Sequence, residues 1–141
     1  MKVIGIEIDN SRAIFFALEE IGSDKKDITN NFKQLKLNDD KDNSEMQSFQ
    51  SIVFSYFDTI NPDRIAILSR QGKGPYASSS ISFKIEALIQ CYAKKNIEFV
   101  SPQGLTAFYK KNAFDLNISH NYQEKAAKLS NSLLKKWTIQ Q

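Results

Sequence analysis

The first eighteen residues hold two strongly apolar runs that are separated by a short polar turn. The first run, residues 2–9, is rich in β-branched side chains, and the second, residues 12–18, reads RAIFFAL. Side chains of these types favour strands, and Asn10-Ser11 between them supplies turn chemistry. The N-terminus is therefore predicted to form a β-hairpin, which commits the chain to a fold built on an antiparallel strand pair.

Helical and strand patterns alternate along the rest of the chain. We interpret residues 19–31 as a loop or wide turn and residues 32–37 as a third, half-exposed strand. Apolar side chains recur at three- and four-residue spacing over residues 44–60, which predicts a helix. The run RIAIL at residues 64–68 is typical of a strand that is buried on both faces. Further helices are expected near residues 80–92, 105–111 and 122–137, and a fifth strand at residues 97–100.

The resulting order is β-β-β-α-β-α-β-α-α, which predicts an α/β fold with a mixed five-stranded sheet flanked by helices. A length of 141 residues fits one domain over residues 1–141. The sequence has no apolar run near the roughly 20 residues of a membrane span and no signal-peptide pattern. Its single cysteine, Cys91, cannot form an internal disulfide, so we expect a cytoplasmic protein.

The formal charge of +3 is distributed unevenly along the chain. Residues 1–63 contain seven Lys or Arg and twelve Asp or Glu, whereas residues 64–141 contain twelve Lys or Arg and four Asp or Glu. A basic second half could attract nucleic acid or another polyanion. Lysine pairs such as Lys94-Lys95 could instead lie at helix C-termini, where the helix dipole favours cations.

Two strings carry a family resemblance: GIEID in the first strand, and ILSRQGKGPYASSSISFKIEALIQ from the fourth strand into the next helix. They are similar to a small bacterial family of unknown function, domain-of-unknown-function family 3010, whose members resemble the RuvC-like branch of the ribonuclease H-like fold. The resemblance extends from residue 2 to about residue 110. It implies a bacterial or phage protein with a ribonuclease H-like fold, and Mg²⁺ or Mn²⁺ as the cofactor of any activity.

Active proteins of this fold resemble two-metal nucleases, with carboxylates on the first strand, at the end of the fourth strand and on the last helix. Glu7 falls at the first-strand position, and Asp9 shares its face because strand side chains alternate. Glu124 is the acid available on the last helix. The end of the fourth strand carries Ser69 and Arg70 where an acid is expected, and a serine hydroxyl is a poor ligand for a hard cation.

The resemblance therefore implies a degraded acidic site, and two interpretations of its acids remain open. Glu7 and Asp9 could bind a metal ion, or they could form a structural ion cluster with Arg70 or Lys73. Around the loop after the fourth strand, Arg70, Lys73 and Lys84 are candidate phosphate contacts and Tyr76 is a candidate base-stacking residue. Such a Gly- and Ser-rich segment is more often a simple connection.

The leading hypothesis is a non-catalytic or weakly active domain that binds nucleic acid or a protein partner around the loop from Arg70 to Lys84. The alternative is a metal-dependent nuclease or resolvase that acts on structured nucleic acid with Glu7, Asp9 and Glu124 as catalytic residues. A third interpretation is a pure protein-interaction module. Trp137 is expected to anchor the last helix to the core, although Leu133, Leu134 and Trp137 could also make a homodimer contact.

Overall fold

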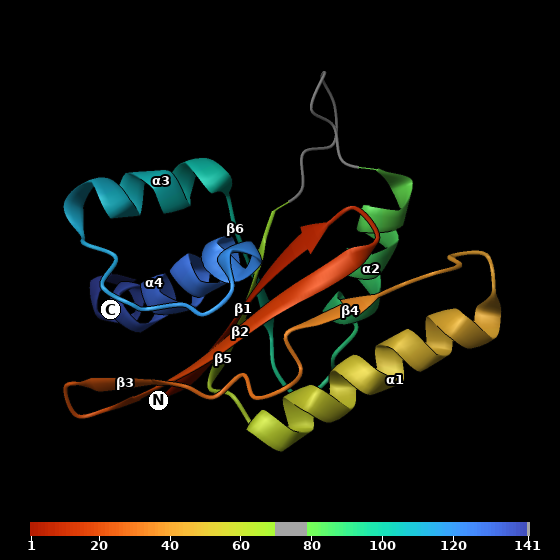
Figure 1. Cartoon of the computed structure of the whole chain (residues 1–141), viewed down its shortest axis with the longest axis horizontal. Helices are drawn as coiled ribbons and strands as arrows, with labels where there is room; N and C mark the ends of the chain where they lie inside the picture. Colours follow the sequence, from red (N-terminus) through yellow and green to blue (C-terminus); the bar gives the residue numbers. More distant parts are fainter. Residues whose placement is uncertain (70–78, 141) are drawn as a thin grey trace.

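The computed structural model describes residues 1–69 and 79–140, with side chains up to Lys135, and places helices on both faces of one mixed sheet (Figure 1). The order across the sheet is β3-β2-β1-β5-β6, and β4 also pairs with β2. The strands are β1 (Lys2–Asp9), β2 (Arg12–Ile21), β3 (Asp24–Asp27), β4 (Gln34–Lys36), β5 (Arg64–Leu68) and β6 (Ile97–Val100). The helices are α1 (Asn43–Ile60), α2 (Ser80–Gln90), α3 (Pro102–Lys111), the 3-10 helix η1 (Asn121–Gln123) and α4 (Glu124–Gln140).

The predicted hairpin and fold are confirmed. Strands β1 and β2 pair antiparallel from Lys2–Glu19 to Asp9–Arg12, and the turn between them has Asn10 at a φ of 55°. Strands β1, β5 and β6 run parallel, as βαβ units require. In the described part of the chain, no helix is long and apolar enough to cross a membrane.

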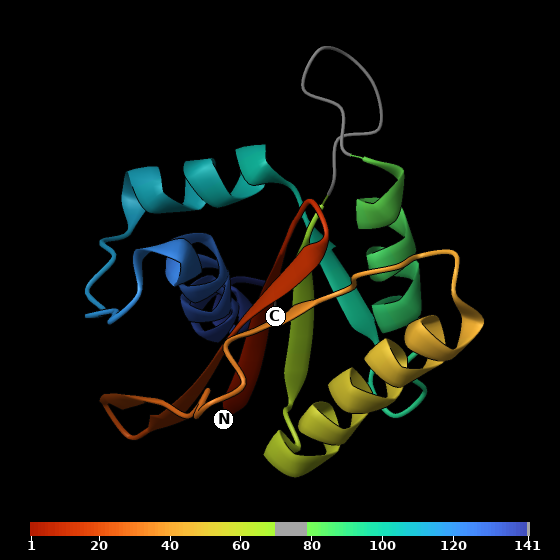
Figure 2. The same ribbon diagram turned by 45° about the vertical axis from the view of Figure 1, so that its right-hand side comes forward.

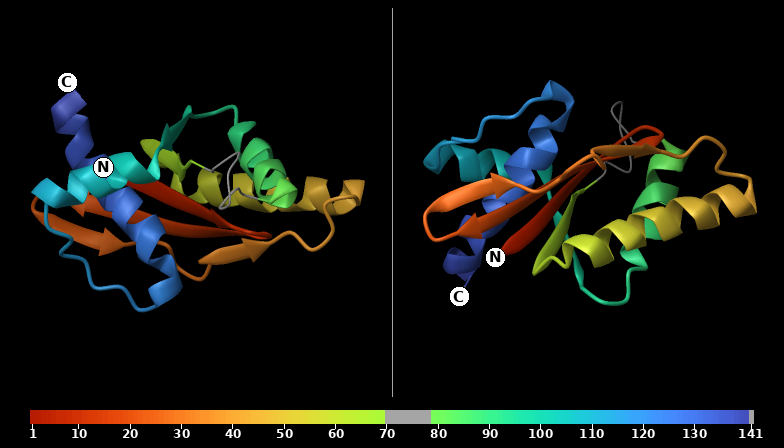
Figure 3. Two further views of the ribbon diagram at one scale, coloured as in Figure 1. Left: turned by 90° about the horizontal axis from the view of Figure 1, so that it is seen from above. Right: turned by 60° about the horizontal axis from the view of Figure 1, so that its bottom comes forward.

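The prediction of five strands with a loop over residues 19–31 is wrong. Strand β2 continues to Ile21, and Asp24–Asp27 forms β3 beside it (Figure 3). The sequence DKKD has no apolar alternation, because this short edge strand is mostly exposed. Between β3 and β4 the buried Thr29 hydroxyl accepts a hydrogen bond from the backbone N–H of Ala17 at 2.9 Å. A side chain thus replaces a strand partner where the edge is interrupted.

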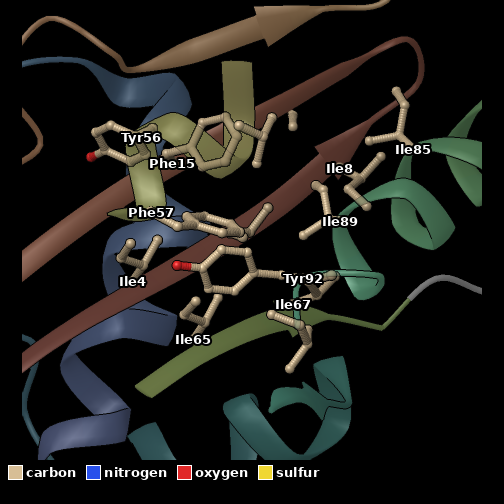
Figure 4. Packing of buried hydrophobic residues seen from close by; sticks show 14 of the residues in the cluster. Ile4, Ile8, Phe15, Tyr56, Phe57, Ile65, Ile67, Ile85, Ile89 and Tyr92 are labelled. Carbon is tan, nitrogen blue, oxygen red and sulfur yellow. The ribbon is translucent and has the colours of Figure 1, made fainter. Parts of the chain in front are cut away.

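Alternation along β1 divides the interior into two cores. Ile4, Ile6 and Ile8 pack in one core with aromatic and aliphatic residues of α1 and α2, and Figure 4 shows Ile4 and Ile8 among them. Val3, on the other face, packs with residues of α3 and α4. The labelled members of the first core are Ile4, Ile8, Phe15, Tyr56, Phe57, Ile65, Ile67, Ile85, Ile89 and Tyr92.

Helix α4 lies directly on β1 at Gly5 (Figure 2). A Cβ atom on Gly5 would lie 2.3 Å from the carbonyl oxygen of Ala126 and 2.7 Å from the backbone nitrogen of Ser130. On the neighbouring strand β5, the buried Arg64 donates through Nη1 to the carbonyl oxygen of Leu133 in α4 at 2.8 Å. The absence of a side chain at Gly5 and the bond from Arg64 together fix the path of α4 across the sheet.

The second core also contains apolar residues near the end of α4. Leu133 is fully buried and Leu134 is 6% exposed, so both belong to the core. Being buried in this core, these two leucines are not available for a homodimer contact, and whether the chain forms a homodimer remains a prediction. The side chain of Trp137 lies outside the described part of the chain.

Replacing Gly5 with alanine should lower the free energy of unfolding by about 3 kcal/mol, the upper part of the range for overpacked cores, because the methyl group meets backbone atoms of α4. Urea unfolding followed by circular dichroism measures this loss. Gly22→Ala is the matched control, since a Cβ there has no neighbour within 4 Å and only the φ of 61° is unfavourable. It should lose roughly 1 kcal/mol. An equal or smaller loss for Gly5→Ala would show that the approach of α4 is not constrained there.

Candidate functional site

An open cleft of about 310 Å³ lies where the end of β1 and the start of β2 meet η1 and the first turn of α4. Glu7 and Asp9 reach it because they share the face of β1 that carries Gly5, against which α4 packs. The N-terminal end of α4 therefore lies beside the C-terminal end of β1. The residues that line the cleft are Glu7, Asp9, Arg12, Ile14, Asn121, Tyr122, Glu124 and Lys125.

Each acid of this cleft has a cationic partner. The Glu7 carboxylate, in a side chain that is only 14% exposed, lies 3.7 Å from Lys125 Nζ. Asp9 Oδ2 lies 3.1 Å from Arg12 Nη2. Glu124 pairs with Lys128 one helical turn further on, at 3.1 Å. We call these three ion pairs the cleft pairs; they bring as many positive as negative charges to the cleft and its rim.

The described acids of the cleft do not make up a group of three metal-ligating side chains. Within residues 1–69 and 79–135, no three Asp, Glu, His or Cys side chains are grouped closely enough to hold a metal ion. At the end of β5, Ser69 stands in the predicted position and its backbone N–H donates to the Val100 carbonyl at 2.8 Å. The hydroxyl there is a weak ligand for Mg²⁺, which prefers carboxylates and water.

Arg12 is held in one orientation by three contacts. Its Nη1 donates to Gln34 Oε1 at 2.8 Å, and its Nη2 donates to Asp9. The guanidinium carbon lies 5.4 Å from the centre of the Tyr122 ring, which is a cation–π distance. The His120 ring lies 5.6 Å from Tyr122 on the same segment. A planar cation is thus fixed on an aromatic ring at the edge of the cleft.

The buried Gln123 attaches η1 to the sheet. Its Nε2 donates to the Phe15 carbonyl of β2 at 2.9 Å. Because Tyr122 and Glu124 flank this residue, the bond also sets their position relative to β1 and β2. Gln123 is therefore a positioning residue for the cleft rather than part of its lining.

The structure brings together Glu7, Asp9 and Glu124, which the sequence analysis named as candidate catalytic residues. Whether they catalyse a reaction or bind a metal remains a prediction. Lys84, a predicted phosphate contact, forms an ion pair with Asp40 at 3.0 Å. A hydrogen bond from Lys84 lowers the pKa of the Asp40 carboxyl below its usual value.

The other three predicted nucleic-acid contacts, Arg70, Lys73 and Tyr76, lie outside the described residues. The structural ion cluster was expected to join Glu7 and Asp9 to Arg70 or Lys73. In the described part of the chain, Glu7 contacts Lys125 and Asp9 contacts Arg12.

Sequence reasoning missed five of the residues that line the cleft, among them Arg12, Tyr122 and Lys125. A signal for Arg12 was available, because Asp9 and Arg12 flank a two-residue hairpin turn and so must face each other. Lys125 and Tyr122 had no such local signal, since their neighbours in the cleft lie at the other end of the sequence.

The family model described as "Protein of unknown function (DUF3010)" matches residues 1–132. No curated protein matches the chain in sequence. Among solved structures, Thermus thermophilus RuvC superposes with a TM-score of 0.72 at 8% identity, covering 99% of this chain and 96% of that chain.

Two further structures agree with this match. T. thermophilus RuvC in complex with Holliday junction substrate gives a TM-score of 0.70 at 8% identity, with coverage of 99% and 96%. The yeast mitochondrial Holliday junction resolvase Ydc2 gives 0.53 at 14% identity, covering 96% of this chain and 67% of that one. At such low identity these similarities establish the fold, and the predicted ribonuclease H-like, RuvC-like architecture is confirmed.

Replacing Gln123 with leucine should lower the free energy of unfolding by about 1–3 kcal/mol, because the substitution removes a buried hydrogen bond to the Phe15 carbonyl. Denaturant unfolding measures the change. Asn121→Leu, an exposed position in the same 3-10 helix, is the control. It should change stability by no more than about 0.5 kcal/mol. Equal effects of the two substitutions would mean that Gln123 does not anchor η1.

Proposed function

Because the chain belongs to the DUF3010 family, whose model matches residues 1–132, and has the RuvC-like fold, we propose that it binds structured nucleic acid without cleaving it. The cleft between β1 and α4 is the proposed contact site. The single observation that carries this proposal is the pairing of every cleft acid with a lysine or arginine.

The cleft pairs favour phosphate over a divalent metal ion. A two-metal nuclease needs carboxylates that are available to bind the ions on which the reaction depends. Here an entering dication would have to displace the Lys125 ammonium from Glu7 and the Arg12 guanidinium from Asp9. A phosphate oxygen instead finds two cations with hydrogen-bond donors, one of them a guanidinium that suits phosphate geometry.

Exposure and charge support the same conclusion. Lys125 is 67% exposed and Arg12 is 32% exposed, so both can reach a ligand in solvent. The excess of lysine and arginine after residue 63 adds long-range attraction for a polyanion. The RuvC neighbour that was solved with a Holliday junction substrate makes a four-way DNA junction the first ligand to test.

A second candidate function is a metal-dependent nuclease or resolvase that uses Mg²⁺ or Mn²⁺. It is favoured by one observation, namely that Glu7, Asp9 and Glu124 all line the same cleft. In that case the metal would act as a Lewis acid on the phosphodiester. Glu7 and Asp9 would hold it, and Lys125 would have to turn away from Glu7.

The purified protein should bind a four-way DNA junction at low salt, and its affinity should fall linearly on a log–log plot as salt rises, because phosphate binding releases counterions. Lys125→Ala should reduce the slope by about one. Fluorescence anisotropy over a series of salt concentrations measures both. Lys94→Ala is the matched control, since Lys94 is also 67% exposed and paired with a carboxylate, Asp58 at 2.9 Å. The proposal fails if DNA and RNA are not bound even at the lowest salt.

Glu7→Gln separates the two candidate functions. If the cleft binds phosphate through its cations, removal of the Glu7 charge should tighten junction binding several-fold, because it removes a repulsive carboxylate beside Lys125. The wild type should also leave the junction uncut in millimolar Mg²⁺ or Mn²⁺. Calorimetric metal titration and gel analysis of the junction provide the measurements. Metal-dependent cleavage by the wild type that disappears in Glu7→Gln would establish the nuclease instead.

A further inference from the structure

We infer that Arg12, fixed on the ring of Tyr122, forms a platform on which an unpaired nucleic-acid base stacks, with the adjacent phosphate held by Lys125. The inference rests on the proposed function and specifies its ligand: a strand with at least one unpaired nucleotide, rather than uninterrupted duplex. The residues concerned line one cleft but come from opposite ends of the chain.

The contacts of Arg12 leave part of its side chain exposed. Asp9 Oδ2 and Gln34 Oε1 accept hydrogen bonds from its two terminal nitrogens, at 3.1 and 2.8 Å. Such bonds lie near the guanidinium plane, because the N–H donors of arginine lie in that plane. The guanidinium carbon lies over the Tyr122 ring, 5.4 Å from the ring centre. A side chain that is still 32% exposed can therefore present its other side to a ligand.

A platform of this kind suits an unpaired base. Nucleic-acid-binding proteins stack splayed-out bases on aromatic rings and on arginine planes. A base inside a duplex already has neighbours on both faces and cannot offer one to Arg12. The three contacts that hold Arg12 also reduce the side-chain entropy that binding would otherwise cost. The fixed orientation of Arg12 is thus what favours stacking over a simple charge contact.

The neighbouring groups can contact the rest of the nucleotide. Lys125 lines the cleft with its ammonium near Glu7 and is mostly exposed, so it can exchange this partner for a phosphate oxygen. The exposed Asn121 can donate or accept hydrogen bonds at a base or sugar edge. Ile14, at 1% exposure, contributes an apolar wall below them.

The experiment uses three DNA duplexes that differ at one position: fully paired, with one bulged adenosine, and with a bulged abasic site. The bulged and abasic probes share the same backbone, so their difference isolates the base. The wild type should bind the bulged adenosine roughly tenfold more tightly than the abasic probe, the effect of one stacking side chain. Fluorescence anisotropy at low salt measures all three affinities.

Arg12→Lys keeps the charge that faces Asp9 but loses the planar group, so it should bind the two bulged probes equally. Tyr122→Leu removes the ring beneath Arg12 and should have the same effect, whereas Tyr122→Phe keeps the ring and should behave as the wild type. Circular dichroism of each variant verifies folding, and Lys94→Ala controls for a change in surface charge.

The outcomes separate the inference from the proposed function. Equal binding of the adenosine and abasic probes by the wild type, or a preference that survives Arg12→Lys, would overturn the platform and leave nucleic-acid binding intact. Failure to bind any of the three probes would overturn the platform, and failure to bind the four-way junction and RNA as well would overturn the proposed function. A preference for the bulged adenosine that Arg12→Lys abolishes would support both.

Discussion

The close approach of α4 to β1 at Gly5 is the contact on which the rest of the structure depends. With backbone atoms of Ala126 and Ser130 where a Cβ would lie, the helix axis can pass only over a residue without a side chain. The same approach brings the first turn of α4, with Glu124 and Lys125, beside the end of β1. A side chain at position 5 would separate the two halves of the cleft as well as the core.

Polar contacts hold α4 at points where apolar packing alone would not fix its register. Arg64 reaches from β5 to the Leu133 carbonyl, and Lys25 of the exposed strand β3 donates to the buried Asn131 at 2.7 Å. Asn131 in turn donates to the Tyr109 hydroxyl, whose pKa burial raises to about 12. Satisfied polar networks of this kind specify one arrangement among several apolar alternatives. The position of the cleft therefore depends on bonds made well away from it.

The three ion pairs of the cleft give it a different chemistry from that of a cleft that holds acids alone, even on the same fold. Carboxylates without partners concentrate negative charge and attract divalent ions, whereas paired carboxylates mainly orient their cations. Asp9 illustrates the second role, because it holds the Arg12 guanidinium in line with Gln34 and above Tyr122. The phosphate and base binding that we propose for this cleft rests on that second role of its carboxylates.

The sequence by itself determined the hairpin, the alternation of helices and strands, and the shared face of Glu7 and Asp9, because these follow from local periodicity and turn chemistry. It also placed Ser69 at the end of a buried strand. It did not reveal β3, whose residues DKKD pair through the backbone with no apolar pattern. Only the tertiary structure decided that Lys125 pairs with Glu7 and that Tyr122 supports Arg12. Such contacts join distant parts of the chain, and their geometry is set by how α4 crosses the sheet rather than by any neighbouring residue.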